Sequence, residues 1–444
     1  MSPLRIPRQI LRASRRGLGK LRRRAFEAGG GGRRWQGAQT MPAPESATLA
    51  ARGPAKARAA AASVNTPAGA RSVEAWAAAL AGGGGWQARS QHPDEAARRQ
   101  MNAEFEAIAA ALLLPLCRAL VRDGEAFVQL GIADDGLRPK LLPADQVDPA
   151  LTRDLGDGAR IVAGVEFDAE DQVVAYHVLR EAPGAPFASY SGAVRVPAGD
   201  MLHVFDRHFP GQVRGVSWLA PVLLKIRDRD EASDALLMQM KTSALLTGFV
   251  RDLDGTAAGF EGETEGSKLN VSLEPGAMRI LPPGADVTFS SPGSGLAQAV
   301  DFLRAQDREI AAGVGLTYEQ LTGDMSEANY SSARVGLLEF RRRAEMLQRQ
   351  LLEHGVLRPL WRRWIEIEAL AGRLSGPVED YYPVRFVPPG WQWVDPQKEV
   401  AAEVAALEAG LKSREEVVAA RGRDIDELDA ERARDAERQG GIAA

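Results

Sequence analysis

The apolar residues of this 444-residue sequence recur with two different periods, and this change of period most limits the folds that the chain can adopt. Between Pro93 and Val121 they are spaced three and four apart, as on one face of a helix: Phe105, Ile108, Leu112, Leu116 and Leu120. From residue 125 strand patterns take over, and the turn signal Asp134-Asp135-Gly136 separates predicted strands at 125–132 and 137–142. The chain therefore combines helices with short strands.

Further strands are predicted in the middle of the sequence. Residues 161–167 and 173–179 flank the acidic turn at 168–171, which is typical of a hairpin, and residues 201–205 form another short strand. We expect a small α+β domain here. At about 150 residues per domain, the whole chain is long enough for two or three compact units.

Long helices dominate the sequence after this region. Ser217 is placed to cap a helix that ends near Gly248, and a second helix runs from Leu296 past Ile310. The segment 251–294 between them is rich in Gly and Pro and has short strand-like pieces, and a loop of mixed character follows at 315–332. The predicted fold class is therefore α+β and mainly helical.

An apolar stripe with heptad-like spacing follows that loop: Leu337, Phe340, Ala344, Leu347 and Leu351. The stripe is either a core face of one protomer, which we favour, or a seam between subunits. Pro359 is expected to kink the helix. Residues 396–438 predict a charged helical segment whose last part is either a solvated helix or a frayed tail.

Charge is distributed unevenly along the chain. Residues 1–34 contain eleven Lys or Arg and one acid, so the net charge of −4 divides into +10 there and −14 in the other 410 residues. Residues 27–72 have few large apolar side chains, and we expect most of them to be mobile or loosely packed. The acidic remainder is a poor candidate for tight duplex binding, which needs cations on phosphates.

Residues with catalytic or metal-binding chemistry are sparse. Cys117 lies in an apolar helical stretch and is expected to be a small buried hydrophobe. His203, Asp206 and His208 are close in sequence, but two strand residues five apart point to opposite faces, so a metal site is disfavoured. No G-x-x-x-x-G-K-[ST], G-x-S-x-G, C-x-x-C or H-E-x-x-H motif occurs. The longest apolar run, 108–117, is too short for a membrane span.

Two stretches resemble the lambda-type phage portal family. They are PGQVRGVSWLAP at 210–221, and GLTYEQLTGD at 315–324 continued by NYSSAR at 329–334. Weaker similarity includes LVRDGEAFV at 120–128 and the Arg-rich opening, and the resemblance covers roughly residues 90–395. It implies a non-enzymatic ring subunit, usually one of twelve, without a cofactor or metal. The motif residues of interest are Gln212, Arg214, Gly215 and Pro221.

The resemblance also implies a division of the chain into portal regions. They are a basic, Gly- and Ala-rich and partly disordered segment (1–90), a wing α+β region (91–217), a stem helix (218–250), a clip (251–294), a second stem helix (295–314), a tunnel loop (315–332), a wing helix and return (333–395), and crown helices with a C-terminal tail (396–444). The implied partners are double-stranded DNA without sequence specificity, the terminase large subunit, a major capsid or scaffold protein and a head-completion protein. The implied location is the portal vertex of the virion, after assembly in the host cytoplasm, with no membrane.

The tunnel loop is expected to face DNA and contains no Lys or Arg; its residues of interest are Thr322, Gly323, Asp324, Met325, Ser326, Glu327, Asn329 and Tyr330. Neutral or repulsive contacts let a polyanion slide, whereas each strong phosphate pair would act as a brake. A polar loop between helices is also common without any DNA.

Two other functions stay open at this point. One is a phage-associated metal-dependent nuclease whose acidic ligands are scattered through the sequence. The other is a DNA-binding adaptor that uses the basic tail, including Arg15, Arg16, Arg22, Arg23 and Arg24.

Overall fold

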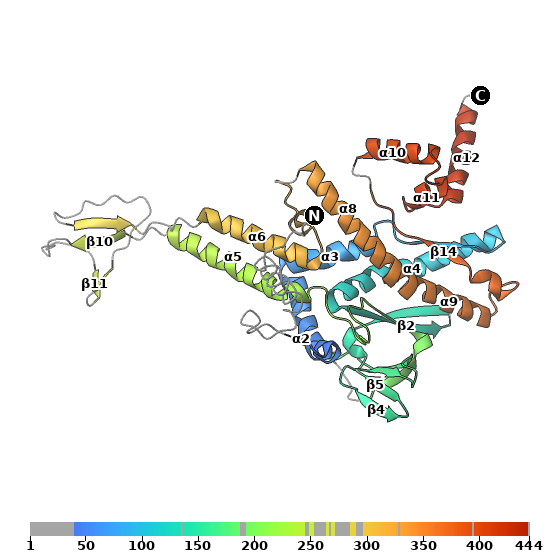
Figure 1. Ribbon diagram of the computed structural model, residues 1–444, viewed down its shortest axis with the longest axis horizontal. Coiled ribbons are helices and arrows are strands. Elements are labelled where there is room, and N and C mark those ends of the chain that lie inside the picture. Colours follow the sequence, from blue (N-terminus) through green and yellow to red (C-terminus); the bar gives the residue numbers. More distant parts are fainter. Residues whose placement is uncertain are drawn as a thin grey trace, which may run out of the picture. The chain divides into compact units, whose positions relative to one another are not determined.

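The structure is a computed structural model (Figure 1). It describes residues 40–134, 136–186, 192–244, 248–252, 263–265, 268–270, 285–289, 296–326, 329–392 and 395–442. The chain divides into a short unit, Met1–Ala47, and a large one, Thr48–Ala444, and the architecture below is that of the large unit. The basic tail residues, Arg15 to Arg24, lie outside the described residues.

Two alanine-rich helices, α2 (Pro44–Asn65) and α3 (Pro67–Ala81), precede the first strand. Thr66 caps α3 by accepting a hydrogen bond from the amide of Gly69, and Pro67 occupies the first helical position, where its missing N–H costs nothing. Trp76 and Leu80 of α3 are fully buried. The expectation of a mobile segment over 27–72 is wrong from Pro44 onward, because alanine favours helix, although only Thr48, Arg52 and Ala59 of α2 are buried.

The long helix α4 (Glu95–Asp123) confirms the predicted apolar face. Phe105, Leu112, Leu116 and Leu120 are buried in the main core, and Ile108 packs against it partly buried. Asp94 caps the first turn through its side chain, and Gly124 ends the helix in a left-handed conformation at φ 89°.

A three-stranded antiparallel sheet follows α4, in the order β3-β2-β9. Its strands are β2 (Glu125–Ala133), β3 (Gly136–Leu142) and β9 (Met201–Phe205), as the sequence predicts. Side chains alternate between the two faces of β2. Ala126 and Val128 enter the main core with the helices, whereas Phe127 enters a second core shared with the next sheet.

The second sheet has five antiparallel strands in sequence order: β4 (Arg153–Gly156), β5 (Ala159–Val162), β6 (Val165–Phe167), β7 (Val173–Val178) and β8 (Val194–Pro197). The strand expected over 161–167 is divided between β5 and β6. Ala163 and Gly164 form the turn, with φ 48° and φ 81°. An alanine at positive φ is uncommon, so this two-residue turn has no strong sequence signal.

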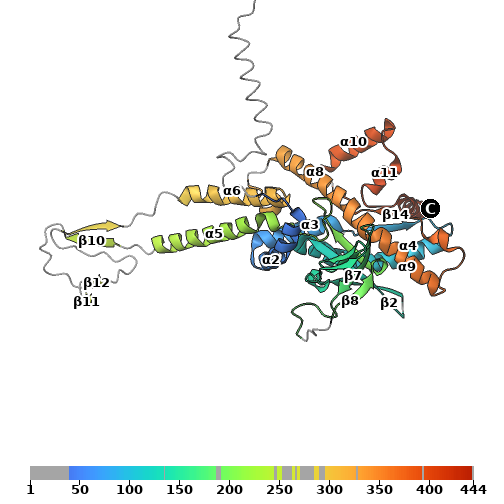
Figure 2. The ribbon, with the colours of Figure 1, turned by 60° about the horizontal axis from the view of Figure 1, so that its bottom comes forward.

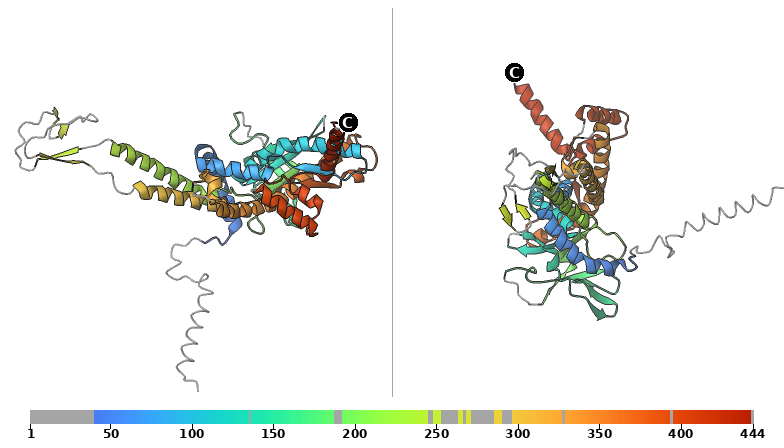
Figure 3. Two further views of the ribbon diagram at one scale, coloured as in Figure 1. Left: turned by 90° about the horizontal axis from the view of Figure 1, so that it is seen from above. Right: turned by 90° about the vertical axis from the view of Figure 1, so that its left-hand side faces the viewer.

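Helices α5 (Leu223–Ala244) and α6 (Leu296–Val314) run antiparallel and side by side in all views (Figure 1, Figure 2 and Figure 3). Arg229 pairs with Asp307 at 3.0 Å and Lys225 with Glu309 at 2.8 Å. A 3₁₀ turn, Ala220–Val222, leads into α5. Between the two helices the described strands pair antiparallel, β10 (Gly248–Asp252) with β13 (Ala285–Phe289) and β11 (Glu263–Glu265) with β12 (Lys268–Asn270).

After α6 come the short helix α7 (Tyr318–Thr322), α8 (Tyr330–Leu347), a π-helix (Gln348–Leu357) and α9 (Arg358–Leu370). The stripe on α8 is a core face of the protomer, because Phe340, Ala344, Leu347 and Leu351 are buried. A kink was expected at Pro359, and the structure has a π-helix, Gln348–Leu357, immediately before α9. Pro359 itself lies in the first turn of α9, where its ring is tolerated.

A 3₁₀ turn, Val378–Tyr381, and strand β14 (Val384–Val387) follow α9, and β14 pairs antiparallel with β1 (Gln87–Ser90). The chain then forms α10 (Pro396–Glu408), α11 (Arg414–Ala419) and α12 (Ile425–Ile442). None of the described side chains in these three helices is buried, and α12 is a solvated helix. Arg89 of β1 pairs with Asp424 and Glu427, each at 3.0 Å.

Within the parts of the chain that the structure describes, no helix is both long enough and apolar enough to cross a bilayer.

Candidate functional site

The loop before α5 buries the side chain of Arg214 completely. Its Nε donates to Oε2 of Glu125 over 2.9 Å and its Nη2 donates to Oε1 over 2.8 Å, the two-pronged geometry that strengthens arginine–carboxylate pairs. The other N–H groups donate to the carbonyl oxygens of Ala144, Val147 and Ala163. The guanidinium also lies over the ring of Phe127, 4.9 Å from its centroid.

Glu125, the first residue of β2, is the centre of this cluster and is fully buried. Besides Arg214, its carboxylate accepts hydrogen bonds from Arg52 at 2.5 Å, from Nε2 of His203 at 3.1 Å and from the amide of Gly215 at 2.9 Å. Burial raises the pKa of Glu125, but the charge of Arg214 and the hydrogen bonds from His203 and Arg214 outweigh burial and hold that pKa well below its ordinary value.

We call Arg52, Glu125, His203 and Arg214 the buried clamp. The clamp joins α2 and β2, which are far apart in sequence, to β9 and to the motif loop that follows β9. Because both carboxylate oxygens are already bonded to donors, Glu125 is occupied as a structural group and is not available as a general base or metal ligand. The role of the clamp is therefore structural: it holds these segments of the fold together.

The other motif residues shape the same loop. Gln212 donates from Nε2 to the carbonyl of Arg214 over 2.9 Å and accepts from the amide of His208 over 2.8 Å. A Cβ on Gly215 would lie 2.2 Å from the carbonyl oxygen of Gly124, so only glycine lets these two backbones approach. Pro221 is exposed and lies in the 3₁₀ turn that starts α5.

Trp76 of α3 connects the two stretches that the sequence singles out. Its Nε1 donates to the carbonyl of Val314 over 2.8 Å, at the end of α6. Its ring contacts Trp218 of the first stretch edge-on, with centroids 5.3 Å apart, and lies 4.8 Å from the ring of Phe340. The sequence did not indicate Trp76, because its partners lie more than 140 residues away.

Residues 315–332 contain more regular structure than a loop. Thr317 and Gln320 form a capping box that starts α7, and Gly323 ends α7 at φ 73°. Asn329 caps α8, so the helix expected from Ala333 begins at Tyr330, for a side-chain reason that spacing alone does not reveal. Glu327 and the side chain of Tyr330 lie outside the described residues.

The turn after α7 is held by its own polar groups. Asp324 accepts from the hydroxyl of Tyr318 over 3.1 Å and from the amide of Ser326 over 3.0 Å, and the amide of Asp324 donates to Thr322. Hydrogen bonds from Ser326, then from Tyr318, lower the pKa of Asp324, so its negative charge is retained. Met325 is exposed.

The segment 315–332 has no Lys or Arg of its own, but a cation from α6 lies beside it. The guanidinium of Arg308 lies over the Tyr318 ring, 5.3 Å from its centroid. The surface around α7 is therefore not purely acidic.

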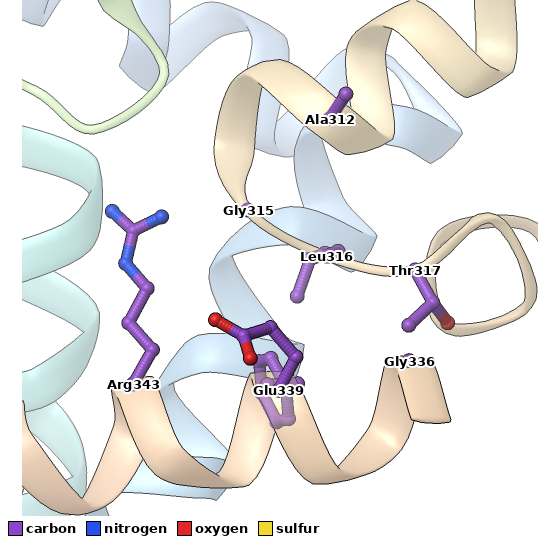
Figure 4. Close-up of a pocket in the computed structure, with 8 residues that line it drawn as sticks. Ala312, Gly315, Leu316, Thr317, Gly336, Glu339 and Arg343 are labelled. Carbon is purple, nitrogen blue, oxygen red and sulfur yellow. The ribbon is translucent and has the colours of Figure 1, made fainter. Parts of the chain in front are cut away.

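An open pocket of about 340 Å³ lies where the segment 315–332 begins, between the end of α6 and α8 (Figure 4). Its lining residues are Ala312, Gly315, Leu316, Thr317, Gly336, Glu339, Phe340 and Arg343. Both apolar and charged side chains reach it, and Arg343 also lies over Trp76.

The histidines considered as metal ligands are separated by their surroundings. His203 shares a hydrogen bond with Glu125, and its ring stacks on the ring of Phe127 with centroids 4.1 Å apart. His208 is exposed. No group of three His, Cys, Asp or Glu side chains that could hold a metal occurs among the described residues. Cys117 is fully buried, and burial raises the pKa of its thiol to about 12.

Comparison with known protein families shows that the stretches 210–221 and 315–334 both lie within one family match. The profile of the family described as phage portal protein, lambda family, matches residues 31–348, which include the whole clamp, both helices α5 and α6 and the segment 315–332. The chain belongs to the lambda family of phage portal proteins.

Relatives of this portal-family chain come from several phages. It is 28% identical over 326 residues to the probable portal protein of Halomonas phage phiHAP-1, covering 70% of this chain and 62% of that protein. It is 27% identical to the portal protein of Escherichia phage N15, covering 70% and 66%, and 26% identical to portal protein B of Escherichia phage lambda, covering 63% and 59%. The chain thus spans about two thirds or less of the length of each.

Solved structures give a weaker likeness. A chain in the neck of a native gene transfer agent particle is 16% identical, with a TM-score of 0.46, and the match covers 80% of this chain and 89% of that one. A chain in the virion of the native gene transfer agent is 17% identical, with a TM-score of 0.44, covering 89% and 96%.

Proposed function

We propose that this chain is a structural subunit of a closed ring at one vertex of a phage capsid, with twelve copies per ring by family resemblance alone. The ring forms the channel through which double-stranded DNA is packaged and ejected, and it is the platform on which the terminase large subunit, the capsid or scaffold protein and the head-completion protein dock. The observation that carries the proposal is the family match over residues 31–348. No catalysis is part of it.

In this proposal the regions keep the assignment that the resemblance implies. Helices α5 and α6 are the stem, the segment 251–294 is the clip, the sheets with α4, α8 and α9 belong to the wing, and α10–α12 are the crown. The short segment around α7 and Asp324 faces DNA.

Surface chemistry supports a ring. The two proposed stem helices expose large apolar side chains that a lone subunit would leave in water: Leu224, Leu237, Met238, Met240, Val300 and Phe302. Burying such surface is the main favourable term in protein association. The negative charge of the chain after residue 34 would surround DNA without holding it, since tight binding needs cations on phosphates.

One experiment separates this proposal from the nuclease and the adaptor. The full chain is incubated with duplex DNA and Mg²⁺ while particle mass is measured in solution. We expect a species near twelve times 47.7 kDa and intact DNA. A small species that cuts DNA would indicate a nuclease. A monomer whose salt-sensitive DNA binding disappears on deletion of residues 1–34 would indicate the adaptor.

A further inference from the structure

Helix α2 is attached to the rest of the protomer with little apolar contact. Its buried residues are Thr48, Arg52 and Ala59, and Ala59 is the only described residue of α2 in the main core. The larger apolar side chain of Val64 is 81% exposed. One buried alanine removes little apolar surface from water, so other interactions hold α2 in place.

Two cations of α2 provide that attachment. Arg52 donates to Oε1 of Glu125 over 2.5 Å and lies 3.8 Å from Asp145, and Lys56, one turn further on, pairs with Asp145. Asp145 belongs to the 3₁₀ turn Ala144–Gln146. The side chain of Arg52 is 6% exposed and that of Lys56 is 17% exposed. We call Arg52 and Lys56 the latch.

The body of the protomer keeps its buried charges paired without the latch. Glu125 has Arg214 as its two-pronged partner and also accepts from the amide of Gly215. Loss of Arg52 therefore leaves no unpaired carboxylate inside the protein. Asp145 would lose its cations, but its side chain is 34% exposed, so water can solvate it.

The last turn of α2 is fixed separately, at its corner with α3. The hydroxyl of Thr66 donates to the carbonyl of Ala62 over 2.8 Å and accepts from the amide of Gly69 over 3.1 Å. A Cβ on Gly69 would lie 2.4 Å from the same carbonyl oxygen, so only glycine fits there. Arg52 lies fourteen residues before Thr66, about 21 Å along a helix. The corner therefore tethers one end of α2, and the latch holds the other half.

His203 shares the carboxylate that the latch uses. Its Nε2 lies 3.1 Å from Oε2 of Glu125, whereas Arg52 is bonded to Oε1. The imidazole also stacks on the rings of Phe127 and Phe205, with centroids 4.1 and 4.6 Å away. The titratable and charged groups around it are Glu125 of β2, Tyr176 of β7, Arg207 after β9, Arg214 of the motif loop and, across the carboxylate, Arg52 of α2.

A proton on His203 and the latch add positive charge to the same place. With α2 docked, the three cations Arg52, Lys56 and Arg214 already surround two carboxylates, those of Glu125 and Asp145. Protonation of the imidazole would add a fourth cation in a site of low dielectric constant. With α2 undocked, the imidazolium and one arginine would face the two carboxylates, and the charges would balance.

We propose that α2 is a releasable arm: Arg52 and Lys56 hold it to the body, and protonation of His203 releases it from the corner at Thr66 outward. Helix α3 and the sheets stay folded in the released state. The device belongs to the single subunit and goes beyond the proposed ring. Because the two events are linked, docking and protonation weaken each other by the same factor.

The direction with pH follows from the docked state. Burial lowers the pKa of His203 below its ordinary value of 6.5, so the docked form favours the neutral imidazole. The arm is therefore docked above about pH 6.5 and is released as the pH falls toward 5. The pKa of Glu125 lies well below its ordinary value of 4.5, so this carboxylate stays ionised over that range.

Hydrogen exchange of the full-length protein, followed by mass spectrometry, tests the release. Peptides from residues 44–60 report on the arm, and peptides from α4 report on the body. Each exchange rate is divided by that of an unstructured peptide of the same sequence at the same pH. Between pH 7 and pH 5 this ratio should rise about tenfold for the arm and stay constant for α4. In His203→Gln, which keeps a donor toward Glu125, the ratio for the arm should not rise.

Three outcomes would overturn the proposal. An arm that is equally protected at both pH values is not released by protons. An equal rise in the unmodified protein and in His203→Gln would assign the release to another group. Loss of protection in α4 together with the arm would show that α2 does not leave a folded body.

A second measurement tests the latch at constant pH. At pH 7, Arg52→Gln and Lys56→Gln should each speed exchange of the arm and leave α4 protected. Arg58→Gln is the matched control, because Arg58 is exposed on the same helix and is not part of the latch. Protection of the arm in both latch variants as strong as in the control would overturn the role of the two cations.

Discussion

At the scale of single residues, the buried clamp shows how one charge inside the protein is tolerated. Glu125 is fully buried, and it is stabilised because Arg214, Arg52, His203 and a backbone amide all donate to it. A buried ion pair contributes little net stability compared with apolar residues, but removing one member leaves an uncompensated charge. The clamp thus makes the fold sensitive to its individual members.

Arg214→Met should lower the free energy of unfolding by about 3–5 kcal/mol, because the carboxylate of Glu125 loses its two-pronged partner in a buried site. Urea denaturation followed by circular dichroism measures this. Arg99→Met is the control, since Arg99 pairs with Glu95 on the exposed surface of α4 and should change stability by less than about 1 kcal/mol. Equal costs for the two variants would show that the clamp is not a stability determinant.

The clamp also predicts how stability depends on pH. Burial lowers the pKa of His203 in the folded protein below its ordinary value of 6.5. Below its ordinary pKa, His203 therefore binds more protons in the unfolded chain than in the folded one. The contribution of neutral His203 to the free energy of unfolding is complete above about pH 6.5 and is lost as pH falls through the folded pKa. The lowered pKa of Glu125 acts in the same direction below its ordinary value of 4.5.

His203→Gln keeps a donor toward Glu125 and removes the titration. Its urea midpoint should fall less between pH 7 and pH 5 than that of the unmodified protein. An equal fall in both proteins would mean that the pKa of His203 does not differ between the folded and unfolded states.

At the scale of elements, each helix of the main core is stable because one of its faces is covered by others in the protomer, and α8 shows this most clearly. Leu347 is buried and its neighbour Met346 is 50% exposed. The buried stripe, with Phe340 and Ala344, faces α3 and the main core. Val335 and Leu338 are exposed on other sides of the helix.

Leu347→Ala should therefore cost about 2–5 kcal/mol of stability, the usual range for a cavity left by a buried leucine. Met346→Ala, one residue away, should cost less than about 1 kcal/mol because little contact is lost. The urea midpoints of the two variants, each compared with that of the unmodified protein, measure these two costs. A larger loss of stability for Met346→Ala would show that the stripe containing Leu347 is not the buried face of α8.

The spacing of apolar residues and the turn residues predicted those elements whose boundaries are marked by neighbouring residues in the sequence. The face of α4, the strands β2, β3, β7 and β9 and the two helices α5 and α6 follow from period and from cap and turn residues, whereas the pairing of α5 with α6 was implied by the family resemblance. Pattern failed for α2 and α3, where alanine-rich sequences form helices with few large side chains, and at Ala163–Gly164, where a turn uses an unusual residue. The clamp was not predictable as a site, because Arg52 and Arg214 lie 73 and 89 residues from Glu125.

At the scale of the whole molecule, the proposed function comes from assembly and not from a reaction. The clamp ties helix α2 to the proposed wing, and Trp76 contacts Trp218 and Val314 of the proposed stem, so subunit geometry would be set before rings form. The exposed faces of α5 and α6 would then be buried by neighbours. DNA would meet the segment around Asp324 inside the channel.

The loop assignment gives a prediction from charge. Replacing Asp324 and Glu327 by Lys should leave ring mass unchanged and reduce DNA packaging, because cations would hold the phosphates that must slide. Asp324→Asn is the control, since it keeps the acceptor for the Ser326 amide and adds no cation. Particle yields of packaged DNA measure the effect. Normal packaging by the Lys variant would contradict the assignment.

Negative-stain images of the purified full-length chain test the central claim most directly. We expect annular particles with a central hole, built from several copies of the chain. Stable single subunits at high protein concentration, with no annular particles in any image class, would contradict this claim.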